Sequence, residues 1–533
     1  MAAGMISRVI GLIYRSPLTA VIGESGIGYY SEAYTFYSNV LMISSYSIPA
    51  AVSKVIAQKL AAREYRNAHR LFYCAMGYVL VVGFLASCLL FFGAGFFVKE
   101  EAVPVLRTFA PTIFIFGILG VLRGYFQAHK SMVQTSLSQI LEQIANAVVS
   151  VGGAALIIKV NLGSLEMPAV GEERIRHAVL GAMGSAMGTG SGVLMALLFM
   201  AWVYSLNRKM ILRRVERDRH ENVDTYGQMI RTITLIVTPF ILSTAVYNFN
   251  ETVNTFLYNK IVPDVRGLDS FLQHQKLGTY SLSLTVLKIP LAFASAMAAA
   301  MIPSVAQACA AGKYDETRES IGTAVKTTMI ITIPSAVGLF VLAKPIVYFL
   351  FPRSDEVVTL AGRILMVLAI SILFYSLSTL SNSILQGLGK VNVPIVNAGI
   401  ALIIQTALSA GLLLLTDMDL YGLAVTNTVY AGMMCLLNQI SLRKAIHYHQ
   451  EWKRSFLLPS IAALIMGAVA RGLYELLLLA LKSPRLALVP AILFGVVVYF
   501  VILLALKTMT EEELRGLPKG HVIVKIAKKC KLL

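Results

Sequence analysis

Two arginines stand in an apolar stretch near the start of the chain, GMISRVIGLIYRSPLTAVIG. On an α-helix, Arg8 and Arg15 lie about two turns and roughly 10 Å apart on one face, which also carries Gly4 and Gly11. A guanidinium group is a planar fork of N–H donors that suits the paired oxygens of a phosphate or diphosphate. We therefore expect Arg15 to face an anion-binding cavity. For Arg8, a place at a membrane interface is an equal alternative.

Three more cationic side chains could serve the same anion: Lys54 in AVSKVIAQ, Arg123 in LRGYFQAHK and Lys288 in LTVLKIPLAF. Lys54 and Arg123 fall near expected helix ends, so we favour anchoring at the membrane interface for both, with anion attraction as the alternative. Lys288 falls in the middle of an apolar run, where a charge is costly unless it faces a polar cavity. We therefore favour a cavity role for Lys288.

Two carboxylates lie among amide side chains within apolar runs. Glu142 belongs to SQILEQ, and YNFNETVN places Asn248, Glu251 and Asn254 at positions i, i+3 and i+6 of one helix. Such clusters can bind a cation or relay a proton, which makes these residues candidates for ion coupling. Hydrogen bonding between helices, or neutralisation of Arg8 and Arg15, is an equally good explanation.

Other patterns of catalysis or metal binding are lacking. The five cysteines are scattered and show neither metal-ligand spacing nor a disulfide framework. The longest expected loop, 207–228, holds no convincing acidic or histidine constellation of the kind that a membrane glycan polymerase or glycosyltransferase needs. We expect neither an enzyme nor a bound cofactor or metal, and we expect a Na⁺ or H⁺ gradient or the membrane potential as the source of energy.

The composition places these residues in a membrane. Of 533 residues, 57% are hydrophobic and only 14% are charged, and the mean hydropathy is +0.71. A soluble protein of this size needs more charge to cover its surface. Continuous apolar runs of about 20 residues recur along the chain, and each can cross about 30 Å of hydrocarbon as a helix. We expect an all-α polytopic membrane protein.

Fourteen transmembrane helices are predicted, and a short loop at Gly23–Gly28 joins the first two. They lie near 3–22, 30–57, 71–98, 104–127, 132–158, 178–206, 229–259, 277–302, 320–343, 357–386, 391–415, 420–442, 456–480 and 485–506. The first run lacks a basic leader, so no cleavable signal peptide is expected, and a start a few residues upstream stays open.

The loop charges predict the orientation. The second, sixth and twelfth loops and the segment 507–533 are basic, whereas the opposite loops at 99–101, 172–174, 354–356 and 417–419 are acidic or mixed. Because basic loops stay on the cytoplasmic side, both termini are expected to be cytoplasmic. The same rule accounts for the net charge of +18 without a nucleic-acid partner.

The chain carries an internal repeat with an offset of 249 residues. VIAQKLAAREYRNA matches SVAQACAAGKYDET, and the paired residues are Ala57, Gln58, Ala61, Ala62 and Tyr65 with Ala306, Gln307, Ala310, Ala311 and Tyr314. Two similar six-helix lobes are therefore expected, with the substrate path between them. The predicted parts are an N-lobe at 1–206, a basic cytoplasmic linker at 207–228, a C-lobe at 229–446, an appended helix pair at 455–506 and a basic cytoplasmic tail at 507–533.

Four stretches carry a resemblance over essentially the whole chain: GMISRVIGLIYR, IPAAVSKVIAQKLAAREYRNA, RGYFQAHKSMVQTSLSQILEQ and ILQGLGKVNVP. With them the chain resembles the multidrug/oligosaccharidyl-lipid/polysaccharide (MOP) exporter superfamily, and within it the flippases of the stage V sporulation protein B type and of lipid II. The resemblance implies alternating access of two lobes that moves an undecaprenyl-diphosphate-linked sugar to the outer leaflet. It also implies a cationic cavity for the diphosphate and a groove for the lipid tail at the last two helices.

The peptidoglycan precursor lipid II is the favoured cargo. Another lipid-linked polysaccharide unit is an alternative, and so is a cation-coupled drug or metabolite exporter of the same superfamily. The appended helix pair and Arg15 argue against the exporter, because such exporters usually have twelve helices and a positive cavity repels cationic drugs. The expected partners are the lipid-linked glycan and membrane lipids, for a monomeric chain in the bacterial plasma membrane.

Overall fold

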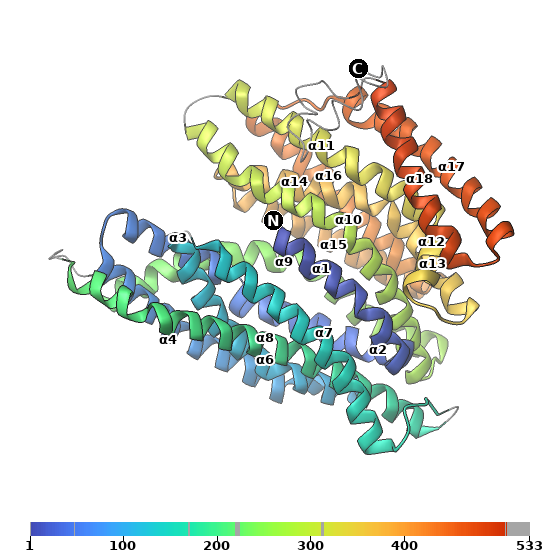
Figure 1. Cartoon of the computed structure of the whole chain (residues 1–533), viewed down its shortest axis with the longest axis horizontal. Coiled ribbons are helices and arrows are strands. Elements are labelled where there is room, and N and C mark those ends of the chain that lie inside the picture. Colours follow the sequence, from blue (N-terminus) through green and yellow to red (C-terminus); the bar gives the residue numbers. More distant parts are fainter. Residues whose placement is uncertain are drawn as a thin grey trace. The chain divides into compact units, whose positions relative to one another are not determined.

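The computed structural model describes residues 2–46, 48–129, 131–168, 171–218, 224–310, 314–506 and 508 (Figure 1). The described residues form helices joined by short turns, without a strand among them, which confirms the all-helical class. Contacts divide the chain into two compact units, which are residues 1–281 with 413–415, and residues 282–412 with 416–533. The division falls within one long helix, and the lobe boundaries inferred from the repeat stay a prediction. The predicted tail at 507–533 lies outside the described residues, apart from Thr508.

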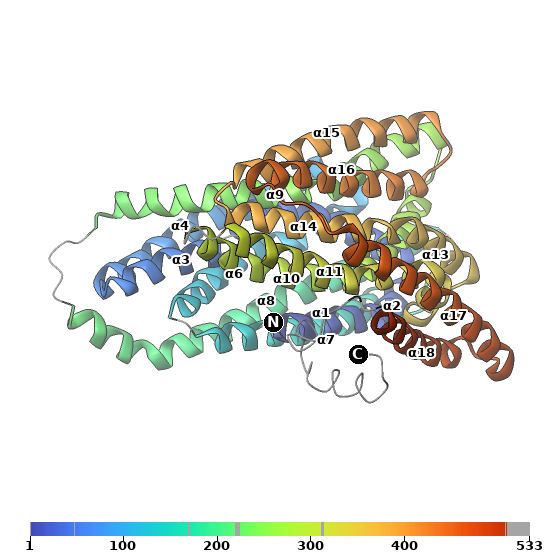
Figure 2. The same ribbon diagram turned by 90° about the horizontal axis from the view of Figure 1, so that it is seen from above.

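The N-terminal unit is a bundle of long helices that runs from α1 into the first part of α10 (Figure 2). Within it α7 and α6 pack on α8, α4 packs on α6, and α1 lies against α7. Its elements are α1 (Ala2–Ile13), α2 (Arg15–Leu41), η1 (Met42–Tyr46), α3 (Ile48–Ala61), α4 (Tyr65–Phe92), α5 (Ala94–Phe97), η2 (Glu100–Ala102), α6 (Val103–Ala128), α7 (Met132–Leu162), α8 (Glu172–Glu216), α9 (Tyr226–Arg266) and α10 (Ser270–Ala310).

The loop predicted at Gly23–Gly28 is shorter in the structure. The helical path of α2 is interrupted at Gly23, whose φ of 72° is accessible to glycine at little cost. Gly26 and Gly28 lie in the helix that follows. There they allow close packing, because a Cβ at Gly26 would lie 3.3 Å from the carbonyl oxygen of Ala178 in α8.

The second unit contains the rest of α10 and the helices that follow. The last two helices form an antiparallel pair, seen in red in Figure 1, and α17 of this pair packs on α11. The elements are α11 (Tyr314–Val341), α12 (Ala343–Leu350), α13 (Asp355–Ala369), α14 (Ser371–Gly387), α15 (Asn392–Leu415), α16 (Leu420–Ile446), η3 (Lys453–Leu457), α17 (Leu458–Leu481) and α18 (Pro484–Ala505).

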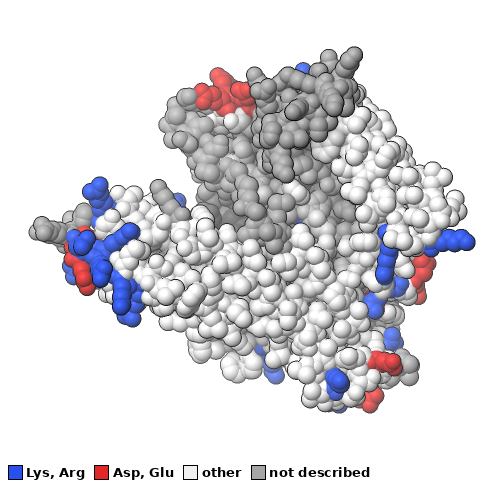
Figure 3. Space-filling view, viewed as in Figure 1, with Lys and Arg blue, Asp and Glu red and all other residues white. Residues whose placement is uncertain are grey.

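The described residues contain ten helices that are long and apolar enough to cross a membrane, or eleven if the bent pair α13 and α14 is one span. That pair is bent by 44°. The finding confirms a polytopic helical membrane protein, while the number fourteen stays a prediction. In Figure 3 the largest group of Lys and Arg side chains lies at the left end of the visible face, more lie at the right and lower right beside Asp and Glu, and the middle of the face is largely uncharged. Charged ends around an apolar middle are typical of membrane-spanning bundles.

Candidate functional site: polar clusters within the helical bundles

Arg15 stands at the first position of α2 and is half-buried. Its guanidinium lies within electrostatic range of Tyr30 in the same helix, and the Tyr30 hydroxyl is 3.4 Å from Thr189 Oγ1 of α8. The rings of Tyr30 and Tyr37 both pack against Phe109 of α6. The arginine thus borders a surface of hydroxyl groups and aromatic rings inside the N-terminal unit. Such a surface can hold a polar group away from hydrocarbon.

The face of α1 that carries the small residues is turned toward α7. The Ser7 hydroxyl donates to the carbonyl oxygen of Gln139 at 3.5 Å, and a Cβ at Gly11 would lie 3.8 Å from Gln143 Oε1. The sequence groups Ser7 and Gly11 on the same face as Arg8, and the contacts place that face against polar residues of α7. The side chain of Arg8 itself lies outside the described residues.

Arg123 of α6 and Glu142 of α7 form a buried ion pair. Arg123 Nη2 is 2.7 Å from Glu142 Oε2, and Arg123 Nε donates to Ser138 Oγ at 2.9 Å. The Arg123 residue is 6% exposed and the Glu142 side chain 17%. Both charges are therefore partly desolvated and stabilise each other. Among the explanations that the sequence left open for Glu142, neutralisation of an arginine matches this geometry, and the arginine is Arg123.

The remaining predicted residues lie elsewhere. Lys54 is exposed on α3, and Lys288 is exposed on the part of α10 that belongs to the second unit. Asn254 of α9 is buried, whereas Asn248 and Glu251 are half-buried, and all three take part in polar interactions. Glu251 is within electrostatic range of Tyr280. Arg15, Lys54, Arg123 and Glu142 thus all lie in the N-terminal unit, where Arg123 and Glu142 meet, whereas Lys288 belongs to the second unit.

A further buried cluster, which the sequence did not predict, joins α2, α9 and α10. Glu32 of α2 and His274 of α10 pair at 2.6 Å, with side chains 1% and 0% exposed. The other carboxylate oxygen of Glu32 accepts from Asn259 of α9 at 2.6 Å. His274 belongs to SFLQHQKLG, which precedes the predicted span at 277–302, so its sequence context suggested a loop. The available signal was an acid at position 32, within a predicted span.

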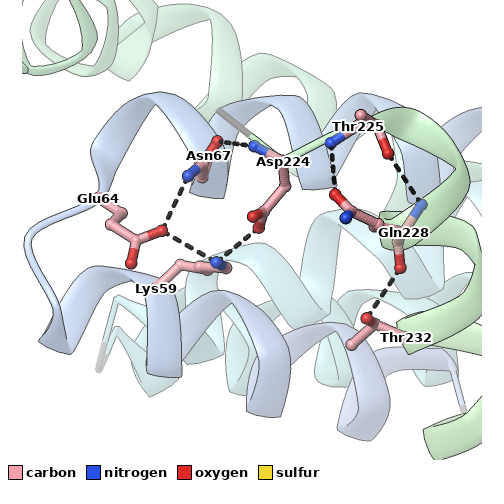
Figure 4. Close-up of polar contacts among 7 residues, drawn as sticks. All are labelled: Lys59, Glu64, Asn67, Asp224, Thr225, Gln228 and Thr232. Atoms are coloured by element: carbon pink, nitrogen blue, oxygen red, sulfur yellow. Dashed lines mark hydrogen bonds and ion pairs between the residues drawn. The ribbon is translucent and has the colours of Figure 1, made fainter. Parts of the chain in front are cut away.

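A second network ties the turn between α3 and α4 to the start of α9 (Figure 4). Lys59 Nζ lies 2.9 Å from Glu64 Oε2 and 2.5 Å from Asp224 Oδ2. Asn67 donates to Glu64 and accepts from the backbone N–H of Asp224. Burial lowers the pKa of Lys59, but hydrogen bonds to Asp224 and Glu64 raise it more, so the net pKa is raised. This network anchors the chain just before α9 within the N-terminal unit.

The second unit contains an apolar groove between α10, α11 and the terminal pair α17 and α18. Its volume is about 540 Å³, and its lining includes Pro290, Phe293, Gly338, Met466, Val496 and Phe500. The hydroxyl of Tyr499, which also lines the groove, donates to the carbonyl oxygen of Ile330 at 2.8 Å. The groove is therefore suited to an apolar chain rather than to a polar ligand.

The fold is shared with solved structures that are described as transporters of the MOP superfamily. Solved structures with the same fold include the lipid II flippase MurJ in an inward closed conformation, with a TM-score of 0.64 and 16% identity over 94% of this chain and 97% of that chain. They also include an inward-facing MATE multidrug transporter, with a TM-score of 0.62 and 15% identity over 83% of this chain and 94% of that chain.

The sequence model of the lipid II flippase MurJ family matches residues 56–482, so the chain belongs to that family. It is 25% identical to the lipid II flippase MurJ of Bacillus subtilis (strain 168), over 87% of this chain and 85% of the relative. It is 22% identical to stage V sporulation protein B of the same strain, over 98% of each chain. The resemblance stated from the motifs is confirmed. The chain is a multi-pass protein of the bacterial plasma membrane in a family of lipid flippases.

Proposed function

We propose that this chain is an alternating-access flippase that moves an undecaprenyl-diphosphate-linked sugar from the inner to the outer leaflet, with lipid II as its cargo. The family of lipid II flippases supports a lipid-linked substrate. The similarity to stage V sporulation protein B makes other lipid-linked glycans the nearest alternative cargo. We further propose that both termini are cytoplasmic, as the loop charges predict.

The apolar groove of the second unit is the observation that carries this proposal. The groove lies between the terminal pair α17 and α18 on one side and α10 and α11 on the other, and it is lined by Phe, Met, Val and Pro side chains. A polyprenyl tail in a bilayer already lies in hydrocarbon, so moving it into a groove gains little hydrophobic free energy. The groove instead selects by shape and guides the tail of a lipid-linked substrate through close packing.

We assign the diphosphate to the polar surface around Arg15. Arg15 is half-buried and lies within electrostatic range of Tyr30, whose hydroxyl is 3.4 Å from Thr189 Oγ1. A half-buried arginine attracts an anion more strongly than an arginine in water, because the surroundings screen it less. Because Glu142 serves Arg123, the cluster of Asn248, Glu251 and Asn254 on α9 is the stronger of the two predicted candidates for binding a coupling cation.

The proposal is tested by flipping in proteoliposomes that hold fluorescent lipid II or another undecaprenyl-diphosphate-linked sugar. We expect inward-facing labelled lipid II to move to the outer leaflet faster than in protein-free vesicles. Equal rates for both glycans would refute lipid II as the specific cargo. Absence of movement for every undecaprenyl-diphosphate lipid would refute the flippase.

Gly338 offers a matched pair of variants for the groove. A Cβ at Gly338 would meet Met466 Cε at 3.9 Å, so Gly338→Leu extends into the groove, whereas a Cβ at Gly472 of α17 has no atom within 4 Å. Overfilling a packed site costs about 1–3 kcal/mol. We therefore expect Gly338→Leu to slow lipid II flipping by roughly 5- to 150-fold and Gly472→Leu to leave the rate unchanged. Equal rates for the two variants would argue against a tail in this groove.

A further inference from the structure

Helices α2 and α10 touch backbone to backbone within the N-terminal unit. A Cβ at Gly28 would lie 1.8 Å from the carbonyl oxygen of His274, and a Cβ at Gly278 would lie 1.9 Å from that of Glu24. Only glycine permits such an approach at either position. Three residues beyond Gly28, the Ser31 hydroxyl donates to Ser281 Oγ at 2.6 Å. Glu32 and His274, whose side chains are 1% and 0% exposed, are shut off from water as long as the two helices stay together.

The Glu32–His274 pair lies at this contact and its geometry requires an extra proton. His274 Nδ1 lies 2.7 Å from the carbonyl oxygen of Ser270, which can only accept, so Nδ1 carries a hydrogen. His274 Nε2 lies 2.6 Å from Glu32 Oε2, and this hydrogen bond needs a second hydrogen. That hydrogen belongs either to an imidazolium beside a carboxylate or to a carboxylic acid beside a neutral imidazole. In both cases the pair holds one proton more than a neutral histidine and an ionised glutamate.

Residues of several helices and of the segment before η2 contact the Glu32–His274 pair. Glu32 Oε1 accepts from Asn259 Nδ2 and from the backbone N–H of Lys99 at 3.2 Å. Gln273 links Asn259 to the Lys99 ammonium, and the Tyr29 ring stacks on His274 at 3.8 Å. Charges of both signs lie nearby, because Glu101 and Asp269 act on Tyr29 through their charges and the Arg174 guanidinium lies 4.1 Å from the centre of the Phe271 ring, three residues before His274. The Lys99 and Arg174 cations and these acids set the field in which the shared proton is held.

We propose that Glu32 and His274 form a proton-binding site that couples the contact between α2 and α10 to pH. When the helices part, water reaches both side chains. A histidine in water loses its proton near pH 6.5, and a glutamate stays ionised above about pH 4.3. Above pH 6.5, separation therefore releases one proton and closure takes one up. This proposal rests on the proposed alternating access, because α2 and α10 must separate during the transport cycle. If they do, the proton that the pair binds and releases is a coupling ion.

The ratio of closed to separated molecules depends on pH in one direction and only above about pH 6.5. Between about pH 4.5 and 6.5 the separated and closed forms hold the same number of protons, so the contact is independent of pH. Above pH 6.5 the closed form binds one more proton, so the ratio of closed to separated molecules falls by up to tenfold for each pH unit. The closed contact is thus favoured in acid and weakened in alkali.

Cross-linking between the two helices measures this ratio without any cargo. Ser31→Cys and Ser281→Cys are introduced together into a chain whose native cysteines are replaced, and disulfide formation is followed from pH 5.5 to 8.5. The reference carries His274→Gln as well, because an amide can donate to Glu32 but does not titrate. The effect of pH on thiol reactivity is the same in both proteins and cancels in the ratio of their cross-linking rates.

We expect this ratio to be constant up to pH 6.5 and then to fall by up to tenfold per pH unit, and we expect Glu32→Gln to abolish the fall. A ratio that stays within twofold across the range would overturn the proposal, and so would an absence of cross-linking at every pH. Failure of lipid II flipping with a pH-dependent ratio would refute the proposed cargo and leave the proton site standing.

Discussion

The buried pair of Arg123 and Glu142 makes a quantitative test of what an arginine does inside this bundle. Glu142→Gln removes the carboxylate and leaves the Arg123 guanidinium, 6% exposed, with Ser138 Oγ as a neutral acceptor. Breaking a buried ion pair by removing one partner costs about 3–5 kcal/mol, because the other charge stays desolvated. A hydrogen bond to the new amide oxygen restores about 1 kcal/mol. We expect the free energy of unfolding to fall by roughly 2–4 kcal/mol.

The assay is reversible unfolding of the purified chain in bicelles, followed by steric trapping or by titration with SDS. Asp315→Asn is the matched control, because Asp315 pairs with Arg318 at 2.7 Å but its side chain is 96% exposed. Exposed pairs contribute only about 0–1 kcal/mol. A loss for Glu142→Gln no larger than that of the control would refute the reasoning.

A double variant separates burial of a lone charge from loss of packing. Arg123→Met with Glu142→Leu replaces both charges by apolar groups, which is often neutral or stabilising by about 1–4 kcal/mol. We expect the double variant to be more stable than Glu142→Gln and to retain lipid II flipping, because Arg123 is assigned to Glu142 and not to the substrate. A stable double variant that no longer flips would instead place Arg123 at the diphosphate.

Two further predictions concern the substrate and the orientation. Arg15→Ala should abolish complementation of a bacterium depleted of its lipid II flippase, at unchanged protein abundance. Arg15→Lys should complement only in part, because an ammonium lacks the planar fork of a guanidinium. Full complementation by Arg15→Ala would contradict an anion site there. Single cysteines at Ala62 and Arg217, both exposed, should react with a membrane-impermeant maleimide only from the cytoplasm, and one at Glu173 only from outside. The opposite pattern would reverse the proposed orientation.

The membrane class could be predicted from the sequence because it depends on the order of apolar and charged residues along the chain, and the family could be recognised from short motifs. A helix must present about 20 apolar residues to cross the hydrocarbon, so the spans appear as a one-dimensional pattern. The cost of a charge in hydrocarbon likewise indicated that Arg15 faces a cavity, whereas Arg123 was expected at the membrane interface and Glu142 in an ion-coupling or hydrogen-bonding cluster. The structure leaves Arg15 half-buried and pairs the other two.

Partners between helices required the tertiary structure. Arg123 and Glu142 are 19 residues apart, and Glu32 and His274 are 242 apart. Whether such residues meet depends on the rotation and register of two packed helices, which side-chain packing decides and a hydropathy pattern does not record. The glycines of GESGIG are a second example of a packing contact that the sequence pattern does not record. Their sequence alone suggested a turn, but Gly28 is instead the point where α10 approaches α2 closely enough to enclose Glu32 and His274.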